Sequence, residues 1–154
     1  MTTTNPMEPV VKEAEGEVPH AEWHPLWSSQ LARPWITLAV IAVDPGTDAS
    51  RVAEVLASVG NRLGARSVRI VSTAGATATE ARGVLEQLTD VPPGGDHVLV
   101  TCDPLRANPA MLPILQAVSG VVLVVRLGSS LIASAKQIVD AVGRERVFAT
   151  VAIG

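Results

Sequence analysis

The chain has 154 residues, of which 47% are hydrophobic and 18% charged, so it is long enough for one folded domain with a real core. Aromatic residues make up only 3% and tyrosine is absent, so Val, Ile, Leu and Ala must build that core. The formal net charge is -3 without any block of basic residues, which argues against a nucleic-acid backbone as a partner.

A single cysteine, Cys102, lies within an apolar run, so the sequence excludes a disulfide framework and a reducing compartment fits best. The polar, acidic beginning of the sequence does not resemble a signal peptide, and no apolar run is long enough to span a bilayer. We therefore expect a cytoplasmic protein, and any association with the inner membrane is expected to come through a partner.

The sequence ahead of the first strand divides into two parts. Residues 1–19 are rich in Thr, Pro and Glu without an apolar period, and we expect a flexible acidic tail. Residues 20–34 contain two of the three tryptophans. If this segment is helical, the residues on one face are Trp23, Leu26, Trp27 and Leu31. Such a face either packs on its own domain or docks a partner, and its first three residues are the candidate partner contacts.

Two histidines, His20 and His24, flank Trp23 and raise the question of a metal site. A protein metal site needs further ligands nearby, and the surrounding sequence offers no third Cys, His or acidic cluster. We therefore expect no metal and no cofactor.

From residue 35 to residue 154, apolar runs alternate with helical periods. The predicted strands are residues 36–43, 67–72, 97–102, 120–126 and 147–153. Four helices are predicted between these strands. The first ends at Gly64 and has an apolar face of Val52, Val55, Leu56, Val59 and Leu63. The second begins near Thr77, the third covers residues 109–117, and the fourth has an apolar face of Leu131, Ala135, Ile138, Val139 and Val142. This alternation predicts one α/β domain over 35–154, with a doubly wound, mostly parallel sheet in three layers.

One helix start carries a specific signal. Thr77 and Glu80 have the spacing of a capping box, in which each side chain accepts a backbone N–H at the beginning of a helix. The expected apolar face of that helix is Ala81, Val84, Leu85 and Leu88. The Pro and Gly residues at 92–95 then predict a loop.

The first predicted strand leads into a stretch with the layout of a phosphate-binding loop. Its apolar run ends at Asp44, Pro45 and Gly46, and helical periodicity begins a few residues later. Ligands of doubly wound sheets lie beyond the carboxyl ends of the strands, so the loop over 44–50 is the candidate site. Small hydroxyl residues follow other strands too, as in a polar crevice, although such residues also simply end strands.

Three stretches carry a family resemblance: DPGTDASR at 44–51, VLVTCDP at 98–104 and VSGVVLVVRLG at 118–128. They resemble, in that order, the PGEGKST loop, the strand ending in DTPP and the aDgvllVvrxG segment of the ATPase domain of bacterial tyrosine autokinases, which are capsule and exopolysaccharide co-polymerase ATPases. Pro45, Gly46 and Ser50 match that loop and are what remains of it. The resemblance covers about residues 21–154 and implies a P-loop ATPase fold of the class that includes chromosome-partitioning and septum-site proteins.

The residues that would bind a nucleotide in that family are replaced here. The loop lysine is Ala49, the glycine before it is Asp48, and a second lysine of the wider class is Asp44. A triphosphate would meet two carboxylates and no lysine, and each charge contact at ~4 Å is worth roughly 4 kcal/mol at an effective dielectric of about 20. Of the matching residues, only Ser50 keeps a role in the chemistry, as the magnesium-side hydroxyl.

The acids that hold magnesium and orient water in that family are missing as well. The second predicted strand ends in Ser72, where the family has an Asp-x-Asp pair, and the third ends in Thr101, where it has the magnesium-linked Asp. Asp103 is either a displaced substitute or a turn carboxylate before Pro104. The family's base-contacting Asn has no counterpart in residues 150–154, and a chain without tyrosine cannot autophosphorylate on tyrosine.

The sequence therefore predicts an ATPase-like protein of the pseudokinase kind, with no catalytic residues. The resemblance implies a scaffold or regulatory subunit of a bacterial exopolysaccharide or capsule synthesis or export machine. Its expected partner is a protein, either a membrane-bound co-polymerase or synthase or a second copy of the chain. The stretch AEWHPL at 21–26 resembles the family's subunit-contact helix, although the arginines of that helix are absent.

Two other functions are open. A nucleotide- or small-molecule-binding enzyme would use the crevice at the strand ends in a new way, with Ser50, Asp103 and Ser129 as polar contacts. A partitioning-type ATPase that works on DNA or membrane is disfavoured by the acidic net charge and the missing lysines.

Overall fold

The computed structural model describes residues 12–13, 35–63, 66–90, 95–128 and 132–153. Its strands are β1 (Lys12–Glu13), β2 (Thr37–Ala42), β3 (Val68–Ser72), β4 (His97–Cys102), β5 (Gly120–Arg126) and β6 (Val147–Ile153). Its α-helices are α2 (Ala49–Leu63), α3 (Ala78–Thr89), α4 (Leu112–Ala117) and α5 (Ile132–Val142), with 3-10 turns η2 (Pro109–Met111) and η3 (Arg144–Arg146). None of the helices described here is long and apolar enough to cross a membrane.

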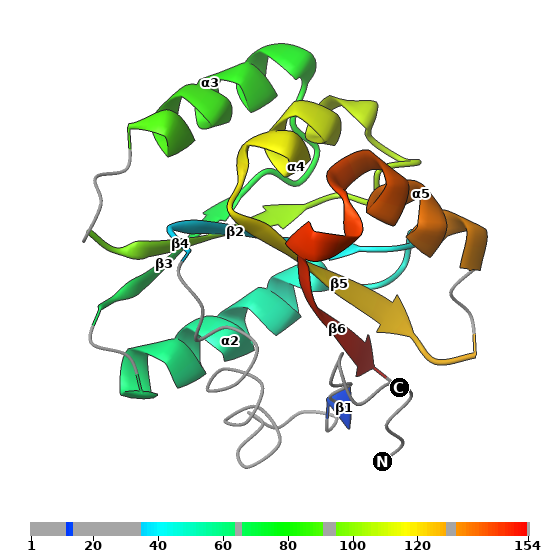
Figure 1. Cartoon of the computed structure of the whole chain (residues 1–154), viewed down its shortest axis with the longest axis horizontal. Coiled ribbons are helices and arrows are strands. Elements are labelled where there is room, and N and C mark those ends of the chain that lie inside the picture. The colour runs from blue at the N-terminus through cyan, green and yellow to red at the C-terminus, as the bar shows by residue number, and fades with distance from the viewer. Residues whose placement is uncertain (1–11, 14–34, 64–65, 91–94, 129–131, 154) are drawn as a thin grey trace.

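The six strands form one sheet in the order β1-β6-β5-β2-β4-β3, and every pair is parallel. Helix α2 covers one face of the sheet, and α3, α4 and α5 cover the other (Figure 1). The predicted three-layer, doubly wound α/β architecture is therefore confirmed. This arrangement leaves β2 in the centre, with β4 on one side and β5 on the other.

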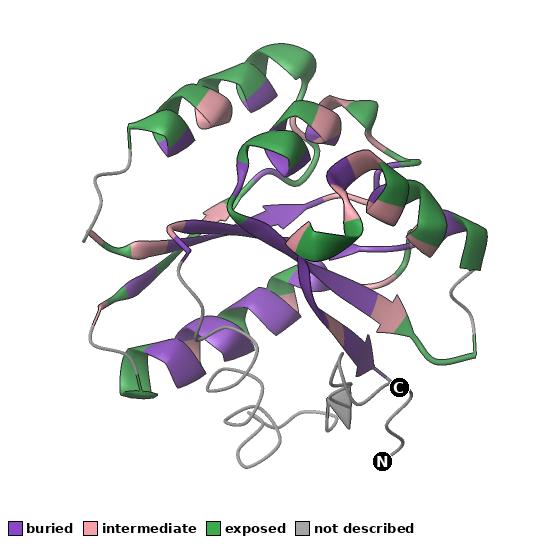
Figure 2. Cartoon of the chain, viewed as in Figure 1, coloured by how far each residue is buried: buried purple, intermediate pink, exposed green. Residues whose placement is uncertain are grey.

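Two apolar cores, one on each face, hold the helices to the sheet. On the α2 face, Leu38, Val40 and Leu99 of the strands pack with residues of α2 such as Leu56. The residues that alternate with them, such as Ile41 and Val100, point to the other face and pack with α4 and α5. Because both faces are covered, every residue of β2 is buried, which explains the unbroken apolar run in its sequence. Figure 2 shows this burial in the central strands and along α2.

Most element bounds agree with the predictions. Strands β4, β5 and β6 begin and end where the sequence predicts, and the capping box of Thr77 and Glu80 is present at the start of α3. The expected faces of α3 and α5 turn inward, with Ala81, Leu88 and Ile138 buried.

Two local features differ from the predictions or add to them. The helix expected over 109–117 is a 3-10 turn followed by α4, because the Asn108 side chain accepts the N–H of Ala110 and closes a tighter first turn. Lys12–Glu13, within the expected tail, pairs with the end of β6 as a short edge strand. The rest of the expected tail and the tryptophan segment 20–34 lie outside the described residues.

Candidate functional site

The candidate site is a crevice between the carboxyl ends of β2 and β4, which we call the β2–β4 crevice. The two strands are neighbours, but the chain leaves them toward opposite faces of the sheet, into α2 and into η2 and α4. In doubly wound sheets, ligands bind beyond the carboxyl ends of two neighbouring strands whose following segments go to opposite faces of the sheet. The crevice has a volume of about 190 Å³. Its lining residues are Ala42, Thr47, Asp48, Ala49, Ser50, Ala74, Thr101, Cys102, Asp103 and Pro104.

In the loop after β2, a carboxylate of the loop itself caps the start of α2. Oδ1 of Asp48 accepts the backbone N–H of Ser50 at 3.0 Å. Asp48 is the residue just before α2, and Ser50 lies in the first turn of that helix. In a phosphate loop, the free N–H groups of this turn face the ligand. Here Asp48 satisfies one of them and places its negative charge at the positive end of the helix dipole. The turn at Gly46, with φ 88°, brings the chain back to start the helix.

The remaining loop residues divide between the core and the solvent. Ala49, in the place of the family's lysine, is only 6% exposed and packs in the core of the α2 face. Ser50 is exposed and lines the crevice, whereas Pro45 and Gly46 are exposed but do not line it. Of the three residues that match the phosphate loop, only Ser50 therefore faces the candidate site.

Thr101, the last residue but one of β4, is part of the crevice wall. Val40 of β2 pairs with it on one side and Ser72 of β3 on the other. Its side chain is 3% exposed, and its Oγ1 makes no hydrogen bond within the described part of the chain. The Thr101 carbonyl, by contrast, accepts a 2.6 Å hydrogen bond from the hydroxyl of Thr73.

Cys102 also lines the crevice but offers no nucleophile. The thiol is buried, and burial raises its pKa to about 12. It therefore stays protonated at neutral pH, whereas a reactive cysteine needs an accessible thiolate.

Asp103 links the loop after β3 to the loop after β4 through hydrogen bonds. Its Oδ2 accepts the N–H of Gly75 at 2.7 Å and the side-chain amide of Asn108 at 3.1 Å. The same amide donates to the carbonyl of Ala76 at 3.0 Å. These contacts favour the interpretation of Asp103 as a turn carboxylate over that of a displaced magnesium ligand. Asn108 was not a sequence candidate, although an Asn before a Pro is a recognisable turn and capping signal.

The crevice as a whole is acidic. Asp48 and Asp103 contribute two carboxylates, and the hydroxyls come from Thr47, Ser50 and Thr101. Within the described part of the chain, no Lys, Arg or His lines the crevice. Among the residues described, no three His, Cys, Asp or Glu side chains gather closely enough to hold a metal ion. This set of groups can accept hydrogen bonds and attract cations. Its two negative charges disfavour the binding of a polyphosphate.

The other sequence candidates lie outside the part of the chain that the structure describes. These are Ser129, His20, His24, Trp23, Leu26 and Trp27.

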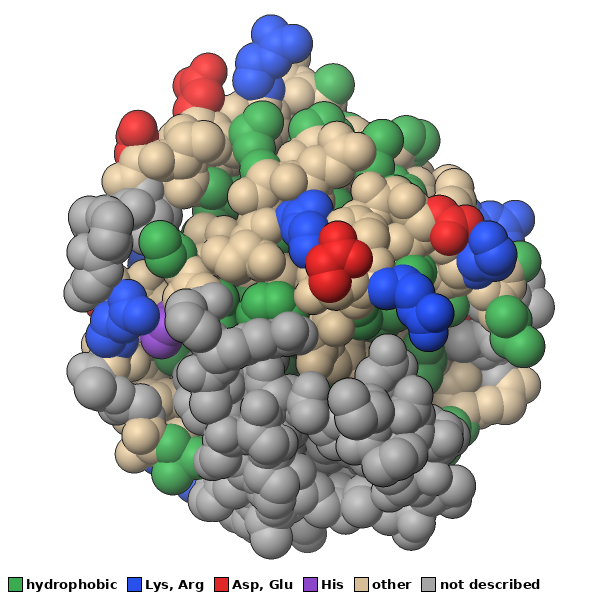
Figure 3. Space-filling view, viewed as in Figure 1, with side chains coloured by type: hydrophobic (Ala, Val, Ile, Leu, Met, Phe, Trp, Pro, Cys, Tyr) green, Lys and Arg blue, Asp and Glu red, His purple; other side chains and the backbone are tan. Residues whose placement is uncertain are grey.

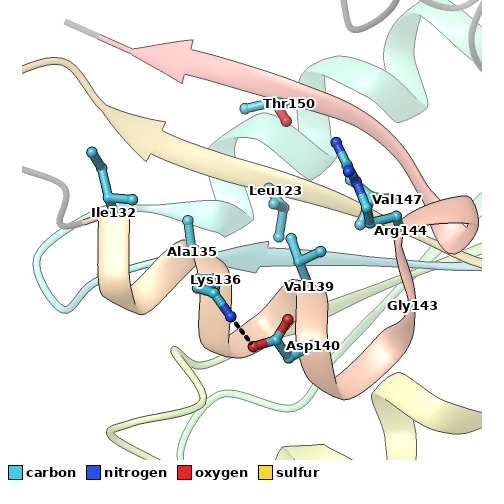
Figure 4. Close-up of a pocket in the computed structure, with 10 residues that line it drawn as sticks. All are labelled: Leu123, Ile132, Ala135, Lys136, Val139, Asp140, Gly143, Arg144, Val147 and Thr150. Carbon is cyan, nitrogen blue, oxygen red and sulfur yellow. Dashed lines mark hydrogen bonds and ion pairs between the residues drawn. The ribbon is translucent and has the colours of Figure 1, made fainter.

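A second, larger hollow lies beside α5, and we call it the α5 groove (Figure 4). Its volume is about 630 Å³, and Leu123 of β5 and Thr150 of β6 form its base. On α5, Lys136 and Asp140 form an ion pair at 2.7 Å. Most other lining residues are aliphatic, and Ile132 at the mouth is 87% exposed. The α5 groove has the greater volume, but polar residues make up a larger share of the lining of the β2–β4 crevice, which also lies at the carboxyl ends of the strands, so we take the crevice as the candidate site.

Compared with known protein families and with curated proteins, the chain matches none of them.

Proposed function

We propose that the chain is a non-catalytic, ATPase-like scaffold or regulatory subunit of a bacterial exopolysaccharide or capsule synthesis or export machine. One observation carries the non-catalytic part: the Asp48 carboxylate caps α2 through the N–H of Ser50, where a phosphate loop would present that N–H to its ligand. The chain supplies its own anion there. The machine itself is taken from the family resemblance of the three motif stretches.

The surroundings of Asp48 support the same proposal. Ala49 packs in the core of the α2 face and lines the crevice with only a methyl group, so no positive charge stands at the position that would carry the loop lysine. Asp103 adds a second carboxylate to the lining. Both carboxylates would repel phosphate oxygens, and the lining residues that the structure describes include no cationic group to offset this.

A role on DNA or directly on a membrane surface has less support. On the face shown in Figure 3, basic side chains stand apart from one another with acidic ones among them. Together with the net charge of -3, this differs from the clustered basic surface that binds phosphate backbones or anionic lipids.

The proposed scaffold acts through protein partners. The candidates are a membrane-bound polysaccharide co-polymerase or synthase and a second copy of the chain, which would place the protein in the cytoplasm or at the inner membrane through that partner. Trp23, Leu26 and Trp27 are the proposed contact residues, because aromatic anchors dominate the energetics of many interfaces.

Calorimetric titration of the full chain with magnesium-ATP tests the non-catalytic proposal. We expect no binding below about millimolar concentration and no hydrolysis. An Asp48→Gly variant is the comparison, since it frees the Ser50 N–H and removes one charge, and it should bind ATP more tightly than the wild type. Micromolar binding by the wild type would overturn the proposal.

A small-molecule-binding enzyme is the second candidate, favoured by the polar crevice itself. The unpartnered Thr101 hydroxyl beside two carboxylates is a set of groups that a ligand can use. Thermal unfolding with ATP, GTP and magnesium separates this candidate from a nucleotide-free scaffold, because only a ligand of the folded state raises the melting temperature.

A further inference from the structure

We propose that the β2–β4 crevice binds a primary ammonium group, held by Asp48, Asp103 and Thr101. This inference does not depend on the proposed scaffold function, because a crevice that rejects phosphate can serve a scaffold or an enzyme equally. Three features carry it. They are a buried hydroxyl without a hydrogen-bond partner among the described residues, two carboxylates that each use only one oxygen in hydrogen bonds there, and the match between the acceptors of this small crevice and the donors of an ammonium group.

The hydroxyl of Thr101 is the first feature. Side chains alternate along β4, and Leu99 packs in the core on the α2 face, so Thr101 turns to that same face at the end of the strand. There it lies near the first turn of α2 and lines the crevice. Its Oγ1 is buried without a hydrogen-bond partner in the described residues. Buried polar atoms are nearly always partnered, so a partner from outside the protein is expected.

The two carboxylates are the second feature. Asp48 uses Oδ1 for the N–H of Ser50, and Asp103 uses Oδ2 for Gly75 and Asn108. The second oxygen of each carboxylate makes no hydrogen bond within the described part of the chain, and both residues line the crevice. Since none of the described residues that line the crevice is cationic, the negative charge of the two carboxylates favours a cationic ligand.

The third feature is the match between acceptors and donors. An ammonium group has three donors and no acceptor, and the crevice offers three acceptors, one each from Asp48, Asp103 and Thr101. A volume of about 190 Å³ equals roughly six water molecules at ~30 Å³ each, so it suits a compact group. A Ca²⁺ ion takes about six to eight oxygen ligands, more than two carboxylates and one hydroxyl supply.

The ammonium group has two possible sources with the same chemistry: a free small amine, or a lysine side chain of a protein partner. The test is an NMR titration of the ¹⁵N-labelled full chain with ethylammonium chloride, with sodium chloride at equal ionic strength as the control. We expect saturable shifts at the amides of Ser50, Gly75 and Thr101. A blocked Gly-Lys-Gly peptide and its acetyl-lysine counterpart form the second arm. Binding of only the unmodified peptide along with ethylammonium indicates a partner lysine, and binding of ethylammonium alone indicates a free amine.

Matched variants identify the groups involved. Asp48→Asn keeps the helix cap, since Asn caps as well as Asp, but it removes the charge and should weaken binding about tenfold. Thr101→Val keeps the side-chain shape without the hydroxyl and should also weaken binding, by roughly threefold to tenfold. Glu86→Gln removes one charge from the exposed surface of α3 and should leave the affinity unchanged.

Shifts that rise linearly without saturation, or that sodium chloride reproduces, would overturn the proposal. So would equal affinities of the wild type, Asp48→Asn and Glu86→Gln. If Thr101→Val does not fold, the Asp48→Asn comparison still decides, because that variant retains both the cap and the core.

Discussion

In the proposed non-catalytic, ATPase-like protein, the Asp48 carboxylate and the Ala49 methyl group are the two groups that disfavour phosphate binding. Asp48 occupies the N–H of Ser50, and Ala49 is buried in the core of the α2 face. Adding a lysine at position 49 therefore places a charged side chain where the structure is apolar. It leaves the anion at position 48 in place, and it does not restore the acids missing at Ser72 and Thr101.

We accordingly expect that Ala49→Lys alone will not restore ATP hydrolysis, since magnesium still lacks its acidic partners. Steady-state phosphate release at saturating magnesium-ATP is the measurement. The double variant Asp48→Gly with Ala49→Lys is the control, and it should gain affinity for ATP without gaining hydrolysis. A rate for the single variant well above the no-enzyme background would show that hydrolysis does not need acids at positions 72 and 101.

His97 makes the stability of the domain depend on pH. Its ring stacks on that of Trp35, with 4.1 Å between the ring centroids and 29° between the planes. Burial lowers the pKa of His97 below its ordinary value of 6.5, and the nearby Arg66 guanidinium lowers it further. As pH falls below 6.5, His97 is therefore protonated in the unfolded chain before it is protonated in the folded chain.

The free energy of unfolding should therefore be constant above this range and decrease as pH falls through 6.5 toward the lower folded pKa. Urea unfolding at about pH 8 and about pH 5, for the wild type and for His97→Gln, isolates this contribution, because the carboxylates titrate alike in both. The wild type should lose more stability between the two pH values than the variant does. Equal losses would mean that His97 is not responsible.

At the scale of the elements, Arg146 joins two helix ends. One guanidinium nitrogen donates to the carbonyl of Leu115 in the last turn of α4 and to that of Val118, the residue after the helix. The other donates at 3.4 Å to the carbonyl of Val142 at the end of α5. Carbonyls at helix C-termini lack partners within the helix, so a forked cation satisfies several of them at once.

Arg146→Lys should destabilise the domain by about 1.5 kcal/mol or more, because an ammonium group cannot reach both helix ends in the geometry of the fork. Arg144→Lys is the matched control in the same 3-10 turn, and its exposed side chain predicts a change within about 0.5 kcal/mol. Urea unfolding measures both. Similar losses for the two variants would show that the fork is not what holds α4 and α5 together.

The elements themselves were predictable to different degrees. The bounds of β4, β5 and β6 follow from apolar runs between clear turn residues, and the cap of α3 follows from a local pair, Thr77 and Glu80. The bond between Asp48 and Ser50 is equally local, and an Asp just before a helix is a known cap. The bond between Asp103 and Gly75 joins residues 28 apart in sequence and depends on which strands are neighbours. The order of the strands, and hence this bond, is not encoded in any local pattern.

At the scale of the whole molecule, the described strands and helices contribute to two cores, one on each face of the sheet. Helix α2 packs mainly on β2, β3 and β4, whereas Val151 and Ile153 of β6 are buried on the same face of the sheet. The two interpretations of Trp23 and Trp27, as partner contacts or as core residues, predict different losses when both are removed.

As partner contacts, Trp23 and Trp27 are surplus apolar area ahead of the first strand of the domain, and proteins rarely leave such a patch unused. Replacing both with Ala should weaken self-association or partner binding by ~2 kcal/mol or more, and stability should fall by less. Sedimentation and pull-down experiments measure the association, and urea unfolding measures the stability. Trp35→Phe is the control: because Trp35 is buried against His97, this variant should lose stability while its association is unchanged. If instead the double variant unfolds outright, and the wild type is a monomer without a partner, the two tryptophans belong to the core.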